Sequence, residues 1–487
     1  MADFVAADAT AATSGVSRRD DRLAVFAGLW AAAALFHALG PSGRATDVVH
    51  DVTAVGVGHV LLVLAALWVL VAPYRLLPVV ALAALGPITA WQEAPVLGNH
   101  WFVAAAVDAG LLLALLASRR ERTFDTAALT EGFLPVARWI LVAFYAFAAF
   151  DKLNTAFFDT TVSCGAVYFD ETVRTIGLSA PLAVGHGGWA SFVPIGTALT
   201  ELSIPILLVF RRTRTAGVLV GLVFHGLIAL DQEHLFSDFS SVLGALFVLF
   251  LPEEFSTFVV ELVRRRGREL LASWVALAAV VSAAQWSGKG GLVDSVFVDG
   301  RMWLWFLLDA ALVGTVGSWI WQRRAVALER PFGLSRRARW LSVVPVIVIL
   351  NGFTPYVELK TAFSYSMYSN LSTVDGDSNH LLVRATLPIG DRLADLVQVQ
   401  ASTDPGLAVY ATRGYLLPWD SFRAYLSAHP TARVRYVRDG VVHDLAHAAD
   451  QPGLTNAPPT VVQKLLPLRA VDTHDPPRCQ ENFLPAL

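Results

Sequence analysis

The sequence predicts a polytopic α-helical membrane protein with a small β-rich domain at its C-terminal end. Hydrophobic residues fill 55% of the 487 positions and charged residues only 16%, whereas soluble domains average about 25% charged residues. Apolar segments of roughly 20 residues, the length that crosses a bilayer, recur about eleven times before residue 356. Beyond that point the apolar runs shorten to the length of β-strands.

The first 22 residues precede these segments and end in a cluster of charged residues. No small-residue cleavage site follows a short apolar core there, so we expect a cytoplasmic N-terminal tail and no removable signal peptide. The predicted spans, in chain order, are residues 23–39, 52–72, 76–92, 101–117, 134–151, 190–210, 215–231, 239–251, 269–287, 302–322 and 340–355. We assign 23–252 to a membrane core with the candidate site and 253–355 to additional transmembrane helices.

The distribution of arginine predicts how these helices are oriented. With the N-terminus inside, alternate crossings place the arginine-rich stretches 119–122, 211–214, 264–268 and 323–339 in the cytoplasm. This excess of positive charge in cytoplasmic loops is the positive-inside pattern. An odd number of spans then places everything after Pro355 on the extracytoplasmic side. The net charge of −3 and the scattered arginines leave no basic face, so we expect no nucleic-acid partner.

Residues 356–487 predict a small α+β or mostly β extracytoplasmic domain. Short apolar runs predict strands at residues 381–387, 396–400, 407–411, 434–438 and 441–445. The last two runs flank Asp439-Gly440, a pair typical of a two-residue hairpin turn. Residues 419–428 predict a short helix that ends before His429-Pro430.

The sequence contains two cysteines, Cys164 and Cys479, and the predicted topology places both outside the cytoplasm. Such a compartment permits oxidation. A disulfide would tie the loop after the fifth span to the C-terminal domain. Two buried thiols that remain reduced fit the sequence equally well.

A set of titratable side chains falls near the extracytoplasmic ends of five predicted spans. These residues are His37, His59, His100, Lys152 and His225. Ionisable groups at membrane depth are costly and tend to face a bundle interior or an aqueous cavity, so we interpret the set as the lining of one cavity. The alternatives are a lysine that extends to the interface and histidines that only pack.

A general base suits Lys152 better than a metal site suits the histidines. Burial disfavours the ammonium form, so that a neutral amine could accept a proton. The side chains of adjacent helical residues point about 100° apart, so we expect Asp151 and Lys152 to face different sides of the helix. The histidines lack the i, i+4 spacing of a helix-borne metal site, and we expect no metal. Glu201, inside the sixth predicted span, fits a hydrogen-bonded structural role.

Several motifs resemble the HTTM membrane domain of vitamin K-dependent gamma-glutamyl carboxylase and its bacterial relatives. They are Asn99-His-Trp-Phe102, Phe144-Tyr145, Asp151-Lys-Leu-Asn154, Phe224-His-Gly226, His234-Leu-Phe-Ser237 and Phe363-Ser-Tyr-Ser-Met-Tyr-Ser-Asn370. Their order and approximate spacing are similar as well, and residues 23–252 would form the HTTM-like core. The resemblance is thin between the motifs, and the lysine motif is its best anchor.

The resemblance implies a chemistry and a set of substrates. Lys152 would deprotonate reduced vitamin K or menaquinone, His100 would support the reaction, and His225 would match a family position of less certain role. Oxygen would convert the quinol into a strong base that removes a γ-proton from a glutamate-containing peptide, and the carbanion would capture carbon dioxide. Asn99, Tyr145, Asn154, His37 and His59 are then the candidate quinone-binding residues.

The chain also departs from that family. The animal enzyme has two lysines where this chain has Asp151-Lys152, and its extracytoplasmic region is considerably longer. The sequence therefore leaves three hypotheses: a carboxylase-like or quinol-oxidising membrane enzyme, a non-catalytic quinone- or lipid-binding protein or transporter, and a membrane anchor for the C-terminal domain. Transport is disfavoured because no paired broken helices or inverted halves are evident.

Overall fold

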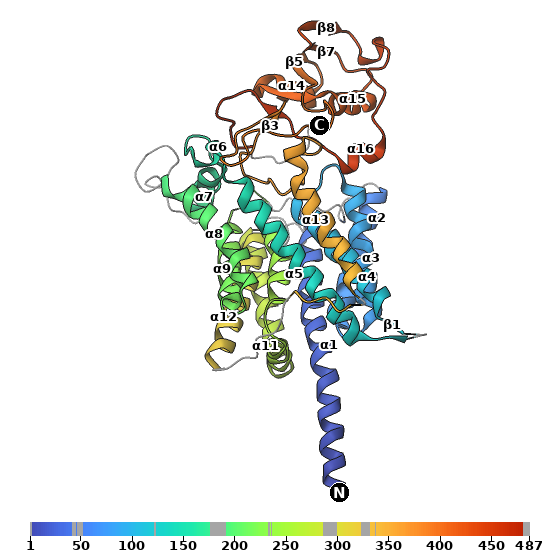
Figure 1. The fold of residues 1–487 in the computed structure, drawn as a ribbon, viewed down its shortest axis with the longest axis vertical. Helices are drawn as coiled ribbons and strands as arrows, with labels where there is room; N and C mark the ends of the chain where they lie inside the picture. The colour runs from blue at the N-terminus through green and yellow to red at the C-terminus, as the bar shows by residue number, and fades with distance from the viewer. Residues whose placement is uncertain are drawn as a thin grey trace.

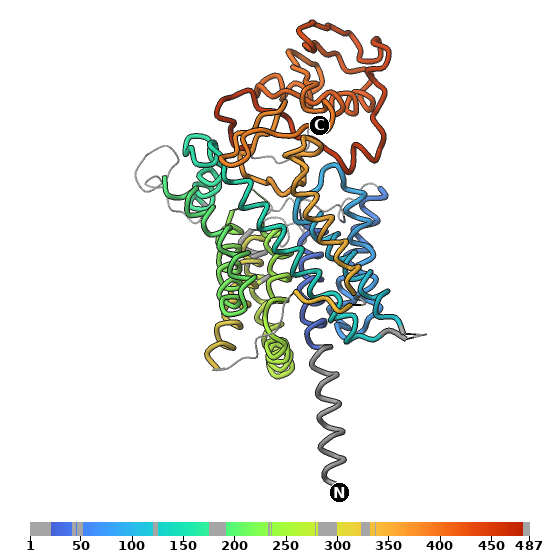
Figure 2. The backbone as a smooth tube through the Cα atoms, viewed as in Figure 1, coloured from blue at the N-terminus to red at the C-terminus, as the bar shows by residue number. Residues whose placement is uncertain are grey.

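The computed structural model consists of a helical bundle with a region of short helices and strands packed on one of its ends (Figure 1). The structure describes residues 2–40, 45, 52–120, 123–175, 191–231, 234, 236–285, 300–322, 332–336 and 338–480. The part of α1 that Figure 2 draws in colour begins at the end of the bundle opposite the C-terminal region.

The bundle helices follow one another along the chain. They are α1 (Ala2–Leu39), α2 (Ala54–Val71), α3 (Leu76–Glu93), α4 (Asn99–Ser118), α5 (Thr126–Asp151), α8 (Phe192–Val209), α9 (Arg214–Ile228), α10 (Phe236–Val248), α11 (Glu253–Gln285), α12 (Arg301–Gln322) and α13 (Val343–Phe353). Two short helices, α6 (Thr155–Phe158) and α7 (Cys164–Thr175), follow α5 at the end that carries the C-terminal region (Figure 1). A two-residue ribbon of β1 (Arg119–Arg120) and β2 (Thr123–Phe124) joins α4 to α5.

Eight helices in the described part of the chain are long and apolar enough to cross a membrane, and a bent pair raises the number to nine. The bent pair is α10 and α11, which meet at 116°. Pro252 lies at this bend, between the end of α10 and the paired glutamates that begin α11, and its ring removes a backbone hydrogen-bond donor there. The predicted segment 215–231 corresponds to α9, which has only 15 residues. Each of the eleven predicted segments thus overlaps a helix, but fewer than eleven of these helices have the length and composition of a span.

The outer surface of the bundle is apolar. On α2, for example, Leu61, Leu64, Leu67 and Trp68 are all about half exposed. A contiguous apolar surface of this kind is typical of a face covered by lipid. α5 is the most buried of the eight long apolar helices, with 78% of its most apolar window inside the molecule. The side chains of α5 therefore form part of the bundle interior along most of the helix.

The C-terminal region contains a five-stranded antiparallel sheet in the order β8-β7-β5-β6-β9. Its strands are β5 (Leu396–Ser402), β6 (Tyr415–Pro418), β7 (Val434–Arg438), β8 (Val441–Leu445) and β9 (Val471–Asp472), and its helices are α14 (Pro405–Arg413), α15 (Trp419–Ala428) and α16 (Thr460–Leu465). The hairpin of β7 and β8 and the helix α15 confirm two sequence predictions. Asp439 and Gly440 both adopt positive φ, as a two-residue hairpin turn requires.

Two predicted strands are wrong. Residues 407–411 lie in α14, because Asp404 caps the helix by accepting a hydrogen bond from the Leu407 amide and Pro405 occupies its first turn. Residues 381–387 form no strand and make one isolated bridge, between Ala385 and Asp377. The paired residues nearby are instead β3 (Thr373–Val374) and β4 (Asp377–Ser378).

An irregular stretch, here named the 363–370 segment, connects the bundle to the C-terminal region. Four of its non-glycine residues have positive φ: Phe363, Tyr365, Tyr368 and Asn370. Such residues cost free energy and cluster where the surrounding structure imposes the conformation. Near its end, Cys164 in α7 and Cys479 are joined by a disulfide.

Candidate functional site

A cavity of about 320 Å³ lies beside Lys152. Helices α5, α7, α8, α9 and α10 form its walls, and the 363–370 segment closes it with Tyr365, Met367 and Tyr368. Most of the remaining lining is aromatic or aliphatic, including Phe144 and Phe239. Small-molecule pockets typically measure about 300–1,000 Å³ and combine an apolar lining with a few polar groups. The cavity therefore suits a compact apolar ring system.

Lys152 reaches this cavity from the C-terminal end of α5 and has a carboxylate partner there. Its Nζ lies 2.8 Å from Oε2 of Glu201 on α8, and it donates to the carbonyls of Ala148 at 3.3 Å and Met367 at 3.5 Å. Lys152 is only 6% exposed. The ammonium charge is thus balanced inside the molecule, and Glu201 also lines the cavity.

A second polar pair lies in the same cavity. The hydroxyl of Tyr145 hydrogen-bonds Nε2 of His225. The hydroxyl of Ser240 donates to the carbonyl of His225 at 3.1 Å, so its oxygen can accept from Nδ1 of the same ring, also at 3.1 Å. This arrangement fixes the proton on Nδ1 and leaves Nε2 as the acceptor for Tyr145.

Asp151 points away from the cavity. Its Oδ1 accepts a hydrogen bond of 2.6 Å from the hydroxyl of Tyr356, and it is absent from the lining of the cavity. This placement agrees with the expected divergence of adjacent helical residues. Lys152 therefore lines the cavity, whereas its sequence neighbour Asp151 contacts Tyr356 outside it.

Asn99 and Asn154, expected to bind quinone, instead hold backbone. Oδ1 of Asn99 accepts from the amide of Tyr365 at 2.7 Å. Nδ2 of Asn154 donates to the carbonyl of Ser369 at 2.5 Å, and its Oδ1 caps α6 at the Phe157 amide. Both side chains thus anchor the 363–370 segment that closes the cavity. Of the expected quinone-binding residues, Tyr145 is the one that lines the cavity.

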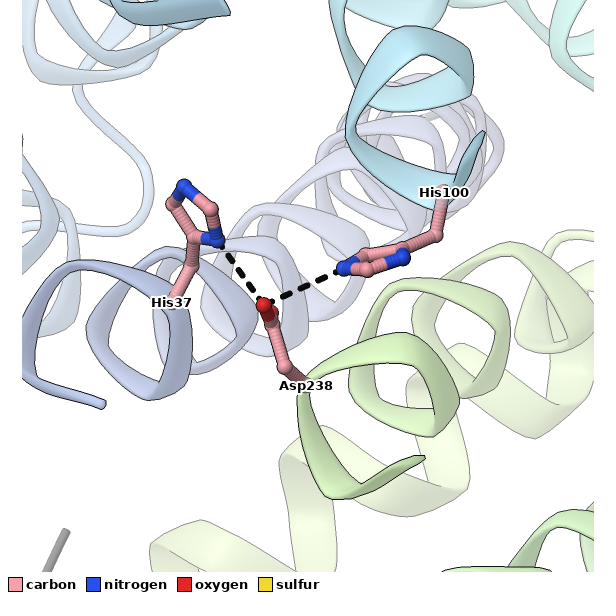
Figure 3. A group of neighbouring side chains, drawn as sticks. All are labelled: His37, His100 and Asp238. Carbon is pink, nitrogen blue, oxygen red and sulfur yellow. Dashed lines mark hydrogen bonds and ion pairs between the residues drawn. The ribbon is translucent and has the colours of Figure 1, made fainter. Parts of the chain in front are cut away.

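His37, His59 and His100 belong to a different group, here named the imidazole–carboxylate cluster. The cluster also contains Glu93 at the end of α3 and Asp238 in α10. Figure 3 shows His37 and His100 approaching the same carboxylate oxygen of Asp238 from different helices. The prediction of one shared cavity is therefore wrong: its five residues divide between two sites. The Phe239 ring contacts both His100 and His225, at 5.6 and 5.0 Å between ring centroids, and so separates the sites.

A histidine–carboxylate group also lies close to the cavity. Nδ1 of His234 is 3.2 Å from both Oδ2 of Asp231 and Oε2 of Glu171, and its ring packs edge-on against the cavity residue Tyr168. Burial alone would lower the pKa of His234, but hydrogen bonds and charge attraction from Asp231 and Glu171 raise it to about 9. The imidazole is consequently charged at neutral pH.

Sequence reasoning missed two carboxylates of these sites, Glu93 and Asp238, and favoured a hydrogen-bonded structural role for the third, Glu201. The contacts of these carboxylates depend on long-range packing, because their partners lie on helices far apart in the chain. A usable signal was present: a carboxylate inside or at the end of an apolar helix is costly and needs a partner.

Comparisons with protein family models, curated proteins and solved structures found no match. The resemblance drawn from the motifs therefore depends on those residues alone.

Proposed function

We propose that this chain is an integral membrane, vitamin K-dependent carboxylase-like enzyme that binds a reduced quinone of the vitamin K type in the cavity beside Lys152. The observation that carries the proposal is the combination of a buried Lys152–Glu201 pair with an aromatic cavity. An apolar ring that bears hydroxyl groups matches both features. Its ring would pack on the aromatic side chains and one hydroxyl would meet the polar pair.

Lys152 is the proposed base, and Glu201 its proton partner. When an apolar ring covers the pair, water is excluded, and a low dielectric disfavours two separate charges. The proton can then move from Nζ to the Glu201 carboxylate. The neutral amine accepts the quinol proton, and the resulting ammonium stabilises the quinolate beside it.

Tyr145 and His225 would orient the second polar end of the ring. Because Ser240 fixes the tautomer of His225, the Tyr145 hydroxyl has a defined acceptor and a defined direction. Such an arrangement costs no reorientation when a ligand enters.

The reactants and products of the proposed reaction balance. Quinol and dioxygen supply a strong base and end as quinone epoxide and water. That base removes a γ-proton from a peptide glutamate, and the carbanion forms a carbon–carbon bond with carbon dioxide. The quinol is oxidised and dioxygen is reduced, so no further oxidant is needed.

We also propose that the N-terminus is cytoplasmic and the C-terminal region is extracytoplasmic, in a bacterial plasma membrane. The β1 ribbon, with Arg119 and Arg120, lies at the bundle end away from the C-terminal region (Figure 1), in keeping with the positive-inside pattern. The disulfide at the other end suits an oxidising compartment. A peptide substrate would then reach the cavity from the extracytoplasmic side.

The decisive experiment supplies the full-length protein in lipid nanodiscs with reduced vitamin K or menaquinone, dioxygen, labelled bicarbonate and a glutamate peptide. The wild type should form epoxide and labelled peptide. Lys152→Ala should lose roughly 100-fold or more of both products, the usual contribution of a general base. Lys464→Ala, a lysine of α16 outside the cavity, should keep both.

Other results would revise the function. Epoxide without label in the peptide would indicate a quinol oxidase. Saturable quinone binding without either product, the same in wild type and Lys152→Ala, would favour the non-catalytic quinone- or lipid-binding alternative.

A further inference from the structure

The imidazole–carboxylate cluster is not used by the proposed function, although it brings together residues from five helices. His37 comes from α1, His59 from α2, Glu93 from α3, His100 from α4 and Asp238 from α10. The three histidines and Asp238 are buried, and the side chain of Glu93 is only 8% exposed. Two carboxylates buried this close together need protons or cations nearby that neutralise their negative charge.

The first half of the cluster consists of His37, His59 and Glu93. Oε1 of Glu93 lies 2.8 Å from Nε2 of His37 and 2.8 Å from Nε2 of His59. Nδ1 of His59 lies 2.9 Å from the Val55 carbonyl, so that nitrogen carries the proton. His59 therefore meets the Glu93 carboxylate through Nε2, and this nitrogen carries either a second proton or a cation that it shares with the carboxylate.

The second half consists of His37, His100 and Asp238. Oδ2 of Asp238 lies 2.8 Å from Nδ1 of His37 and 3.1 Å from Nε2 of His100 (Figure 3). His100 is only 7% exposed, and its Nε2 faces Asp238 as an ion pair, without the alignment of a hydrogen bond among the described residues. An imidazole directed at a carboxylate without an aligned hydrogen bond is suited to share a cation with it.

We propose that the imidazole–carboxylate cluster binds divalent first-row transition-metal ions, zinc or iron(II), in two half-sites that share the ring of His37. Each half-site offers two imidazole nitrogens and one carboxylate oxygen, a ligand set that suits these metals. The ligand atoms within each half-site lie within 4.8 Å of one another, compatible with metal–ligand bonds of about 2.0–2.2 Å after small shifts.

The surroundings support this assignment. The bond from His59 to the Val55 carbonyl is the contact that commonly orients a metal-binding histidine. The ring of His37 stacks on Trp101, with 3.8 Å between ring centroids, which fixes its plane. Occupation of both half-sites would release the ring protons of His37 and connect five helices through one imidazole.

The test measures metal directly and does not depend on enzymatic activity. The full-length protein is expressed with zinc and iron supplementation, purified through a tag that lacks histidine, dialysed against metal-free buffer and analysed by inductively coupled plasma mass spectrometry. The wild type should retain one to two ions per chain. His37→Gln, which removes the shared ligand, should reduce the content at least tenfold.

His234→Gln is the matched control, because His234 also lies between two carboxylates but in another part of the chain. It should retain the wild-type content. X-ray absorption of the wild type should show imidazole ligands with bonds of about 2.0–2.1 Å, a result that does not depend on how well a variant folds. Less than about a tenth of an ion per wild-type chain would overturn the proposal. So would a metal content that His37→Gln leaves unchanged, whether or not His234→Gln reduces it.

Discussion

At the residue scale, the Lys152–Glu201 pair makes each partner depend on the other. Their 2.8 Å contact lies in an apolar cavity, where removal of one partner leaves an uncompensated buried charge. The pair should therefore respond differently to single and double substitution.

Glu201→Gln should lower the free energy of unfolding by about 3–5 kcal/mol, because Lys152 loses its counter-charge. Lys152→Met combined with Glu201→Leu should recover most of that loss and still abolish the proposed quinol turnover. Thermal unfolding of the three proteins in the same detergent measures the effect. A double variant no more stable than Glu201→Gln would contradict this view of the pair.

The His234 group predicts a dependence of stability on pH. Its pKa is raised from 6.5 to about 9 by Asp231 and Glu171. The stabilisation is therefore complete below about pH 6.5 and is lost as the pH rises through about 9.

Between pH 6 and pH 10, the unfolding temperature should fall by roughly 2 °C or more, the shift that about 1 kcal/mol gives in a mid-sized domain. Differential scanning fluorimetry across this range measures it. His234→Gln should have a flatter profile, and an unchanged profile would argue against the raised pKa.

At the element scale, the 363–370 segment depends on side chains from other elements. Asn99 of α4 and Asn154 after α5 bind its backbone, and Asn351 of α13 donates to the Phe363 carbonyl at 3.0 Å. These contacts impose the positive φ angles that the segment contains.

Asn99→Ala should cost about 1–3 kcal/mol, because the buried Tyr365 amide loses its acceptor. Hydrogen exchange of the 363–370 segment should accelerate while α5 keeps its protection. Asn456→Ala, at an exposed turn in the C-terminal region, is the control. Equal exchange in both variants would show that Asn99 does not hold the segment.

The sequence predicted elements better than it predicted their partners. The apolar runs located the helices, and Asp439-Gly440 located the hairpin, because both signals are local. The short apolar run at residues 407–411 predicts a strand, but Asp404 and Pro405 begin a helix there. The roles of Asn99 and Asn154 could not be derived locally, since the backbone they bind lies more than 200 positions later in the chain.

The same limit applied to the candidate site. Lys152 was identified because a lysine in an apolar helix is conspicuous by itself. The grouping of His37, His59 and His100 with it used depth alone, and depth does not report which way a helix faces. The sequence therefore predicted one site where the structure has two, the cavity beside Lys152 and the imidazole–carboxylate cluster.

At the scale of the whole molecule, the disulfide joins α7 to the last described residues of the chain. Cys479 also donates a backbone hydrogen bond of 3.0 Å to the Val162 carbonyl. The two ends of this connection are 315 positions apart in the sequence, so the link restricts a large part of the unfolded chain.

Replacement of both cysteines by serine should lower the free energy of unfolding by about 2–5 kcal/mol. Reductant should lower the unfolding temperature of the wild type and leave that of the double variant unchanged. Thermal unfolding with and without reductant tests both statements. A wild type that is insensitive to reductant after full reduction, verified by mass spectrometry, would contradict them.

The 363–370 segment is translated only after every helix of the bundle, yet it supplies one side of the cavity. Until the ribosome reaches it, the cavity lacks the side chains of Tyr365, Met367 and Tyr368. We expect a ligand that is present during biosynthesis to meet a wider opening than a ligand that binds the finished protein, in which these three side chains line the cavity.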